Sequence, residues 1–427
     1  MGRLGWRGLT RVLTLAAITA LVLPPLFAEA QQSPTPVTSN FSVRIGGYVQ
    51  TNVTWDSDEN TGDNPSALRT LAVQKGADQE GRETLRWAAT RTRLFMDVRG
   101  PEVWGAKSRA YIEFDWDGLK LGETSGAVSA GAAHTPRLRH AYARFDWPTM
   151  YLTAGQTTLV FNSVVSSQSE LEGVSSSHGD ITAGSRNRAP QFILGKVIPI
   201  AGAKLELAGS VGRHATDRTG TAAAGLNDSG SRSGLPALQG LVKGSVPLFG
   251  RDAILAVSNY WGREVLVAGA FREVESTGLA LEAFLPLPAI PGVGAPDLRG
   301  AWFTADNMER WNLGLNGLTS TSPTGVPREI TATGWWAEVN LEILKNFDIG
   351  AGFGHVEDDK NWVNRIGGTS QLPQENNAGW IFGQWNAGPV LVEVLYAKID
   401  TTRILPGTRY ASDMQSDAYH LIFRYRF

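Results

Sequence analysis

Apolar and polar residues alternate along much of this chain. In residues 43–56 the odd positions, from Val43 to Trp55, are mostly apolar, and the even positions, from Arg44 to Asp56, are mostly polar. A period of two places successive side chains on opposite faces of a β-strand. Strands of globular proteins usually run about five or six residues, whereas a tilted membrane-spanning strand needs roughly nine to eleven. The length of this run therefore favours a strand that crosses a membrane.

Comparable alternation recurs to the end of the sequence. The connections alternate in length, with short turns such as 148–149 and 200–202 between long loops such as 57–87 and 158–189. An antiparallel barrel with an even number of strands has this arrangement, with the short turns on the periplasmic side. The pattern predicts sixteen strands, at 41–56, 88–99, 106–117, 137–147, 150–157, 190–199, 203–214, 236–246, 252–262, 272–285, 296–305, 330–341, 347–357, 377–387, 389–399 and 415–427.

The composition of the two faces separates a membrane barrel from a soluble β-sandwich. The polar face of a sandwich is its outer surface, where we expect Lys and Glu. Here the polar faces favour Arg, Asp, Tyr and Gly, and the apolar faces carry aromatic residues near the strand ends. An apolar outside, a polar inside and aromatic girdles are typical of a transmembrane barrel. The predicted fold class is all-β: a single antiparallel transmembrane β-barrel over residues 41–427, with short periplasmic turns and long extracellular loops.

Two segments fit the alternation poorly. In the strand predicted at 137–147, Arg137 and Arg139 share a parity with Ala141 and Phe145. Either a β-bulge resets the phase, or the two arginines lie above the membrane. Alternation is also weak over 252–271, where the faces cannot be assigned.

The N-terminus has the features of a cleaved secretory signal, which we place at residues 1–30. Its first eleven residues carry three arginines and no acid, and an apolar run follows at 12–27. The run ends at Ala28-Glu29-Ala30, a cleavage pattern of small residues. The alternative is a membrane anchor. The apolar run is short for a spanning helix and is broken by Pro24-Pro25, so cleavage is favoured.

Charge and composition exclude several classes of protein. Removal of residues 1–30 takes three of the 39 basic and one of the 41 acidic residues, so the net charge becomes 36 − 40 = −4 with histidine neutral. Nucleic-acid binding needs a concentrated basic face, so no nucleic-acid partner is expected. Cysteine is absent, which excludes a disulfide framework. Beyond residue 30 no apolar run approaches the length of a spanning helix. Residues 31–40 are expected to form a short linker.

The last nine residues, YHLIFRYRF, alternate apolar and polar side chains up to a final aromatic residue. Such an ending resembles the C-terminal signature of bacterial outer-membrane proteins, with Leu421 between the aromatic residues. The resemblance implies that the barrel-assembly machinery recognises this strand. The residues assigned to the assembly signal are Tyr419, Phe423, Tyr425 and Phe427.

Further stretches extend the resemblance to most of the first half of the chain. They are IGGYVQTNVTWD (45–56), TRTRLFMDVRGPEVWGAKSRAYIEFDWDG (90–118), RLRHAYARFDW (137–147), LTAGQTTLVF (152–161) and RAPQF (188–192). With the terminal strand they resemble Gram-negative outer-membrane porins of the sixteen-stranded trimeric type, and among these the porins for dicarboxylate and aromatic-acid uptake. The resemblance implies a homotrimer in the outer membrane, in contact with lipid and lipopolysaccharide, that passes small hydrophilic solutes and needs no cofactor.

The parity of the strands predicts which charged side chains line the lumen. A barrel of sixteen strands is wider than its side chains can fill, and rings of charge then set selectivity. Arginine binds carboxylates through two parallel hydrogen bonds, so the excess of arginine favours passive diffusion of small anionic or carboxylated solutes. The predicted pore-lining residues are Arg44, Arg91, Arg93, Arg99, Arg109, Lys204, Arg424 and Arg426, with Arg137 and Arg139 if the bulge is real, and the acids Asp97, Glu113 and Asp115.

The long loop at 158–189 is the candidate for narrowing the lumen. In trimeric porins the loop after the fifth strand folds inward, and this segment holds that place here. A connection of this length usually indicates function or disorder. The alternative is an exposed surface loop. The charged residues assigned to the constriction are Glu170, Glu172, His178, Asp180, Arg186 and Arg188.

Other functions remain open at this point. A structural or adhesive barrel would act through its external loops, and the lumen arginines could simply pair with lumen acids and select nothing. None of the six histidines lies in a recognisable nucleophile motif, so no enzymatic activity is expected. The acidic stretch at 355–359 could bind calcium weakly, but an external acidic loop is usually only solvated. We therefore expect neither a metal site nor a cofactor.

Overall fold

The computed structural model describes residues 41–57, 83–116, 136–170, 188–214, 229–268, 270–308, 329–359, 372–404 and 411–427. They form seventeen strands and one four-residue helix, α2 (Ser229–Arg232). No helix among these residues is long and apolar enough to cross a membrane. The strands are β1 (Ser42–Asp56), β2 (Thr84–Ala88), β3 (Arg93–Val103), β4 (Ala106–Asp115), β5 (Arg137–Asp146), β6 (Met150–Thr158), β7 (Arg188–Ile200), β8 (Ala203–Gly212), β9 (Ala237–Leu248), β10 (Arg251–Ala268), β11 (Ala270–Pro286), β12 (Pro296–Asp306), β13 (Thr331–Leu344), β14 (Phe347–Asp358), β15 (Leu372–Ala387), β16 (Val390–Ile404) and β17 (Ala411–Arg426).

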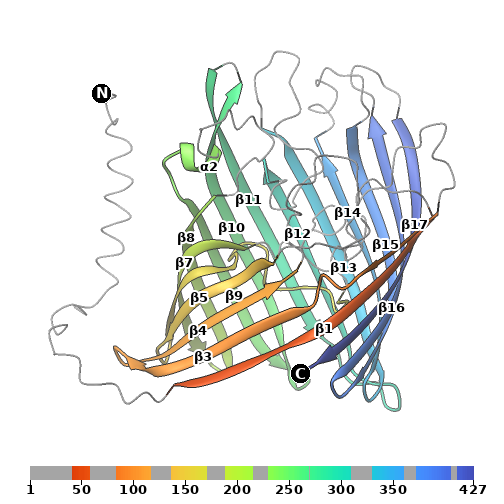
Figure 1. The fold of residues 1–427 in the computed structure, drawn as a ribbon, viewed down its shortest axis with the longest axis horizontal. Helices are drawn as coiled ribbons and strands as arrows, with labels where there is room; N and C mark the ends of the chain where they lie inside the picture. The colour runs from red at the N-terminus through yellow and green to blue at the C-terminus, as the bar shows by residue number, and fades with distance from the viewer. Residues whose placement is uncertain are drawn as a thin grey trace.

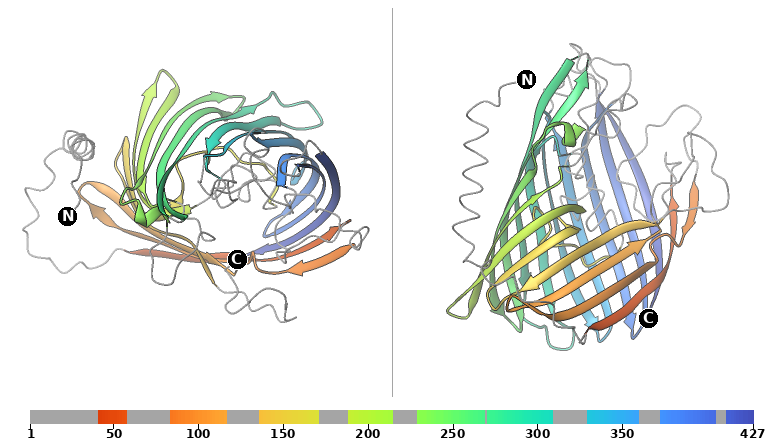
Figure 2. Two further views of the ribbon diagram at one scale, coloured as in Figure 1. Left: turned by 90° about the horizontal axis from the view of Figure 1, so that it is seen from above. Right: turned by 60° about the vertical axis from the view of Figure 1, so that its left-hand side comes forward.

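The strands close into one antiparallel barrel (Figures 1 and 2). From β3 onward each strand pairs with the next, and β17 pairs with β1 from Tyr48↔Arg426 to Asp56↔Ala418. β3 pairs with the first half of β1 and β2 with its second half, so together they fill one position. The predicted all-β barrel with sixteen strand positions is confirmed. Closure gives every strand from β3 to β17 a paired neighbour on each side, which satisfies backbone polar groups where no water is available.

Side chains of the terminal strand show how the faces are divided. On β17, Leu421 and Phe423 are 42% and 49% exposed on the outside. Between and beside them, His420, Ile422 and Arg424 are at most 5% exposed and face the interior. The alternation in the sequence therefore separates the outer surface of the barrel from its lumen, as the two faces of a strand require.

Two strand boundaries differ from the prediction. The loop expected at 263–271 is wrong, because β10 and β11 stay paired up to Ala268↔Ala270. Their tip rises above the neighbouring strands in Figure 1, and a hairpin beyond the membrane needs no apolar face, which explains the weak alternation. The strand expected at 88–99 is interrupted after Ala88. Thr92, in the interruption, accepts a hydrogen bond from the Gln50 backbone N–H at 3.1 Å.

A β-bulge in β5 resolves the parity of Arg137 and Arg139. Glu113 of β4 pairs with His140, and the next residue of β4, Phe114, pairs with Leu138. Arg139 is therefore the additional residue. An extra residue shifts the alternation by one position, so Arg137 before the bulge and His140 after it both face the lumen, together with Arg139 in the bulge.

The inner surface of the barrel has two unlike halves. Inward side chains of β9 to β17 include a buried apolar cluster with Phe303, Trp336 and Leu395, each at most 2% exposed. Leu159 and Phe161, which follow β6 in the sequence, belong to the same cluster. Exposure of these apolar side chains to water in the lumen would cost free energy. This half of the wall is therefore stable only when another part of the chain covers it.

Candidate functional site

A segment after β6, residues 159–170, follows the inner wall of the barrel, and we call it the strap. The yellow chain inside the ring of strands in Figure 2 is this segment. The backbone N–H groups of Val160 and Phe161 both donate to Gln239 Oε1 on β9, at 2.9 and 3.0 Å. The next N–H along the strap donates to Ser258 Oγ on β10 at 2.9 Å. Inward side chains of successive strands therefore replace the partners that the strap would have in a sheet.

Three buried carboxylates hold the rest of the strap. Glu282 on β11 accepts the backbone N–H groups of Val164 and Val165 at its Oε2, both at 2.7 Å. Glu338 on β13 and Glu393 on β16 each accept one strap hydroxyl and one strap backbone N–H. The donors are Ser167 Oγ and Gln168 N (2.8 Å) to Glu338, and Ser169 Oγ (2.6 Å) and Glu170 N (2.9 Å) to Glu393.

Two arginines complete the attachment. Arg299 on β12 donates to the Ser166 carbonyl at 3.2 Å. Arg424 on β17 binds the Glu170 carboxylate with both terminal nitrogens, at 2.9 and 3.1 Å. The strap thus spans the inner face from β9 to β17, and its contacts carry it to the strand that neighbours β1.

The start of the strap is also fixed by shape. Phe161 is fully buried, and its ring lies 5.9 Å from that of Tyr260. A Cβ at Gly278 would lie 2.6 Å from Phe161 Cζ, a distance that real atoms do not adopt. Glycine at position 278 therefore leaves the slot into which the Phe161 ring fits.

The facing half of the lumen is lined by arginines and acids of β1 and β3 to β5, which we call the arginine wall. Arg109 donates to both oxygens of Asp97, at 2.7 and 3.1 Å. Arg137 does the same with Asp115, at 2.9 and 2.7 Å. Two parallel hydrogen bonds fix the guanidinium plane as well as the charge.

Arg139 joins these pairs into one network. From its position at the bulge it contacts Glu113 at 2.8 Å and Asp115 at 2.6 Å, and it is 3% exposed. Arg93 lies 3.6 Å from Glu113, and about a quarter of its side chain is exposed. Arg139 is therefore part of the wall's internal packing, whereas Arg93 presents its charge to the lumen.

Aromatic rings support the same guanidinium groups. Arg144 lies 4.0 Å from the centroid of the Tyr151 ring, and Arg109 lies 5.1 Å from that of Tyr111. Arg93 and Arg424 lie 5.5 and 4.3 Å from the Tyr48 ring. Stacking holds the planar cations against the wall and leaves their edges to donate hydrogen bonds, which Arg109 gives to Asp97 and Arg424 gives to Glu170.

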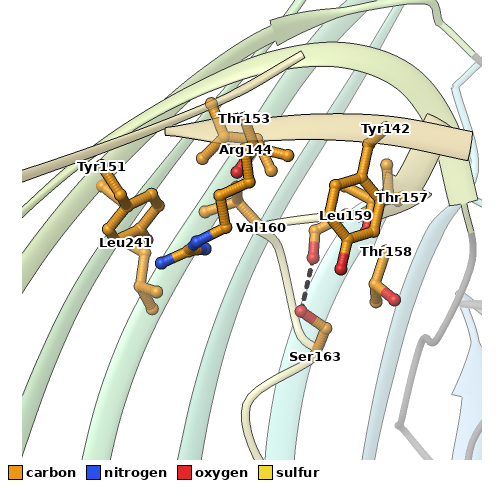
Figure 3. A pocket seen from close by; sticks show the side chains of 12 residues that line it. Tyr142, Arg144, Tyr151, Thr153, Thr157, Thr158, Leu159, Val160, Ser163 and Leu241 are labelled. Carbon is orange, nitrogen blue, oxygen red and sulfur yellow. Dashed lines mark hydrogen bonds between the residues drawn. The ribbon is translucent and has the colours of Figure 1, made fainter. Parts of the chain in front are cut away.

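A pocket of about 190 Å³ lies between the arginine wall and the start of the strap (Figure 3). Arg144, Tyr142 and Tyr151 point into it from β5 and β6, and Val160 and Ser163 of the strap form the other side. Tyr151 donates its hydroxyl to Glu206 at 2.7 Å, which fixes the ring. The pocket combines a cation, aromatic surface and hydroxyl groups, a set that can bind a small polar or anionic group.

Comparison with known proteins identifies the fold. No family model matches the sequence, and no curated protein matches it. Among solved structures, the outer membrane channel DcaP of Acinetobacter baumannii matches with a TM-score of 0.65 at 18% identity, covering 91% of this chain and 97% of that one. OprB of Pseudomonas putida gives 0.56 at 11%, covering 89% and 94%. The anion-selective porin from Comamonas acidovorans gives 0.53 at 12%, covering 91% and 100%.

The chain has the fold of a sixteen-stranded outer-membrane porin. The similarity in sequence is too low to transfer a substrate, because a shared fold does not imply a shared function.

The remaining predicted lumen residues occupy different parts of the barrel. Arg44 lies over the Phe95 ring at 5.5 Å, and its side chain is exposed, as is that of Arg99 near the end of β3. Arg91 is 3% exposed and lies in the interruption between β2 and β3. Lys204 lies 3.8 Å from Asp252 near the turn into β8. Arg426 is exposed and is the last residue of β17, and its backbone N–H donates to Pro389 O at 2.8 Å.

The structure gives two residues a different role from the one predicted for them. Arg424 lies under the end of the strap and is 5% exposed, so it anchors the strap and does not line an open mouth. Arg188 is the first residue of β7 and does not belong to the loop.

The predicted constriction residues Glu172, His178, Asp180 and Arg186 lie outside the described residues. Phe423, Tyr425 and Phe427 are 47% to 58% exposed on the outer surface, as is Tyr419 at 50%.

Sequence reasoning missed two sets of residues. Arg144 and Tyr142 face the lumen only because the bulge shifts the phase of β5, and no sequence feature placed that bulge at one position. The strap carboxylates were also missed. A signal exists for two of them: Glu282 and Glu393 are the single acids on strand faces that otherwise carry mostly apolar or small residues, whereas Glu338 shares its face with Asn340 and Glu342. Among the described residues, no three His, Cys, Asp or Glu side chains gather as metal ligands.

Proposed function

We propose that this chain is an outer-membrane porin for passive diffusion of small hydrophilic solutes, with a preference for anionic or carboxylated ones. The observation that carries the proposal is the division of the lumen into an arginine wall and a facing strap. A closed barrel with this fold provides a water-filled passage, and the strap, which belongs to the predicted constriction segment 158–189, narrows it. Solutes then pass between fixed cations on one side and the strap on the other.

The preference for anions rests on how the arginines are held. The carboxylates of Asp97 and Asp115 are occupied by Arg109 and Arg137, so they offer little to a passing cation. Arg93 and Arg144 are supported by tyrosine rings and keep part of their surface exposed. The network of pairs lowers the net charge of the wall without removing its accessible guanidinium edges. The solved anion-selective porin with the same fold supports the same preference.

A planar bilayer measurement tests the proposal. The purified protein should give single-channel steps and a reversal potential that favours chloride over potassium in a salt gradient. Replacing Arg93 with Gln should reduce the preference for chloride. The matched control is Arg263→Gln, because Arg263 pairs with Glu273 and Glu275 on the outer side of the β10–β11 hairpin. Absence of conductance would favour the alternative of a structural or adhesive barrel, and cation preference would refute the anionic preference.

The cellular context follows from the same proposal. Residues 1–30 are removed during export, residues 31–40 remain as a linker, and the barrel is inserted in the outer membrane against lipid and lipopolysaccharide. The aromatic ending, from Tyr419 to Phe427, is the signal for the barrel-assembly machinery. A homotrimer is supported by the fold, since one solved structure with this fold is a trimer form of OmpT of Vibrio cholerae.

A further inference from the structure

Glu170, the last described residue of the strap, binds a buried cation of the barrel wall. Both terminal nitrogens of Arg424 bind the Glu170 carboxylate, and its Nε donates to Gln50 Oε1 at 2.8 Å. The guanidinium carbon lies 4.3 Å from the centroid of the Tyr48 ring. The contacts of Arg424 thus form a complete site for one carboxylate, and a side chain of the protein itself occupies it.

The two partners differ in how easily they can be exchanged. The Arg424 side chain is 5% exposed, whereas the Glu170 side chain is 37% exposed. Loss of the carboxylate that pairs with a buried guanidinium is strongly destabilising, so Glu170 cannot simply leave. A solute carboxylate can take its place, because it offers the same pair of oxygens to the same fork of donors. Exchange of one carboxylate for another keeps the buried charge compensated.

The rest of the strap is held by a different kind of contact. The backbone N–H of Glu170 donates to Glu393, whose oxygens also accept Ser169 Oγ–H and, at 2.9 Å, Gln384 Nε2–H. These donors carry no net charge, and a solute anion cannot substitute for them. Competition for Arg424 therefore affects the Glu170 side chain and the end of the strap first.

The site is also placed where solutes would arrive. The Tyr48 ring that supports Arg424 is shared with Arg93, whose guanidinium carbon lies 5.5 Å from the same centroid. Arg93 belongs to the arginine wall and is partly exposed. A carboxylate that moves along the wall therefore meets Arg93 and Arg424 beside the same ring.

We infer that Glu170 occupies a carboxylate-binding site formed by Arg424, Gln50 and Tyr48, and that a carboxylated solute competes with it and frees the end of the strap. The inference rests on the proposed function, because it describes how a solute of that class would act on the channel. Glu170 then competes with the solute for Arg424. It neutralises the buried charge of Arg424 when no solute is present, and a bound solute carboxylate displaces it.

Substitutions that remove a single charge test the inference in planar bilayers. Glu170→Gln should shift the reversal potential toward chloride, and succinate should then reduce the chloride current at lower concentration than in the wild type. Arg424→Gln should shift the reversal potential in the opposite direction and weaken the effect of succinate. The control Glu275→Gln removes an acid that pairs with Arg263 away from the strap, and it should change neither quantity. If Glu170→Gln behaves as Glu275→Gln does, the inference is wrong.

Hydrogen exchange in the wild-type protein gives a second test that needs neither a variant nor a conducting channel. Succinate should accelerate exchange in the peptide that contains the end of the strap, and an equal ionic strength of potassium chloride should not. Unchanged exchange with succinate would overturn the inference. A wild-type barrel that shows this acceleration but never conducts would refute the proposed function and leave the carboxylate site standing.

Discussion

Replacing Glu338 with Ala tests whether the strap is held as one unit. Glu338 is 2% exposed and accepts three hydrogen bonds, from Ser167 Oγ, Gln168 N and Trp380 Nε1. Two of the donors belong to the strap and the third belongs to the wall. The substitution removes the acceptor for all three and leaves the neighbouring anchors Glu282 and Glu393 in place.

The magnitude follows from the two strap donors, because the Trp380 contact is present whether or not the strap is attached. Hydrogen bonds to charged acceptors contribute about 1.5–3 kcal/mol each, so two are worth about 3–6 kcal/mol. Water in the lumen can replace part of the lost hydrogen bonding, which favours the lower end of this free-energy range. A loss of about 3 kcal/mol raises the open population of the strap roughly 100-fold.

Amide hydrogen exchange of the folded barrel measures this change directly. The informative amides are those of Val164 and Val165, since their own acceptor, Glu282, is untouched. Their exchange should accelerate by about the same factor if the strap detaches cooperatively. Glu206→Ala is the matched control, because Glu206 is a lumen carboxylate that binds Tyr151 and Lys243.

The reasoning is refuted if the Val164 and Val165 amides exchange at the wild-type rate in folded Glu338→Ala protein. Acceleration confined to Gln168 would show that each carboxylate holds its own donors independently. Acceleration of equal size in Glu206→Ala would show a general loosening of the barrel, which the contacts do not explain.

Three further outcomes are expected. Gly278→Val should displace the Phe161 ring, because even the Cβ would lie 2.6 Å from Phe161 Cζ, and the single-channel conductance should rise. Arg139→Gln should lower the temperature at which the folded band disappears on a gel, because it leaves Glu113 without its closest cation, at a cost of about 3–5 kcal/mol; an unchanged transition would contradict the buried network. Phe427→Ala should reduce the amount of folded barrel in the outer membrane without changing the conductance of channels that do assemble, and normal assembly would show that this residue is not part of the signal.

The sequence predicted the fold well because a membrane imposes a local rule. Every strand that crosses lipid must alternate, so the faces of β1 and β17 follow from parity without any knowledge of their neighbours. The same rule fails where lipid is absent. The β10–β11 tip rises above the neighbouring strands, and its residues carry no readable pattern, so its length was underestimated. The bulge at Arg139 likewise depends on how β4 and β5 align.

By itself, the sequence determined a barrel with an apolar outside, arginines inside and a long segment after the fifth predicted strand. The tertiary structure decided what each charge does. Glu282, Glu338 and Glu393 lie 117, 170 and 223 residues from the strap amides of Val165, Gln168 and Glu170 that they accept. Parity fixes the face of a side chain, but only closure of the barrel and the path of the strap fix its partner. For that reason Arg424 and Arg93, both inward arginines in the sequence, become a strap anchor and a charge presented to the lumen.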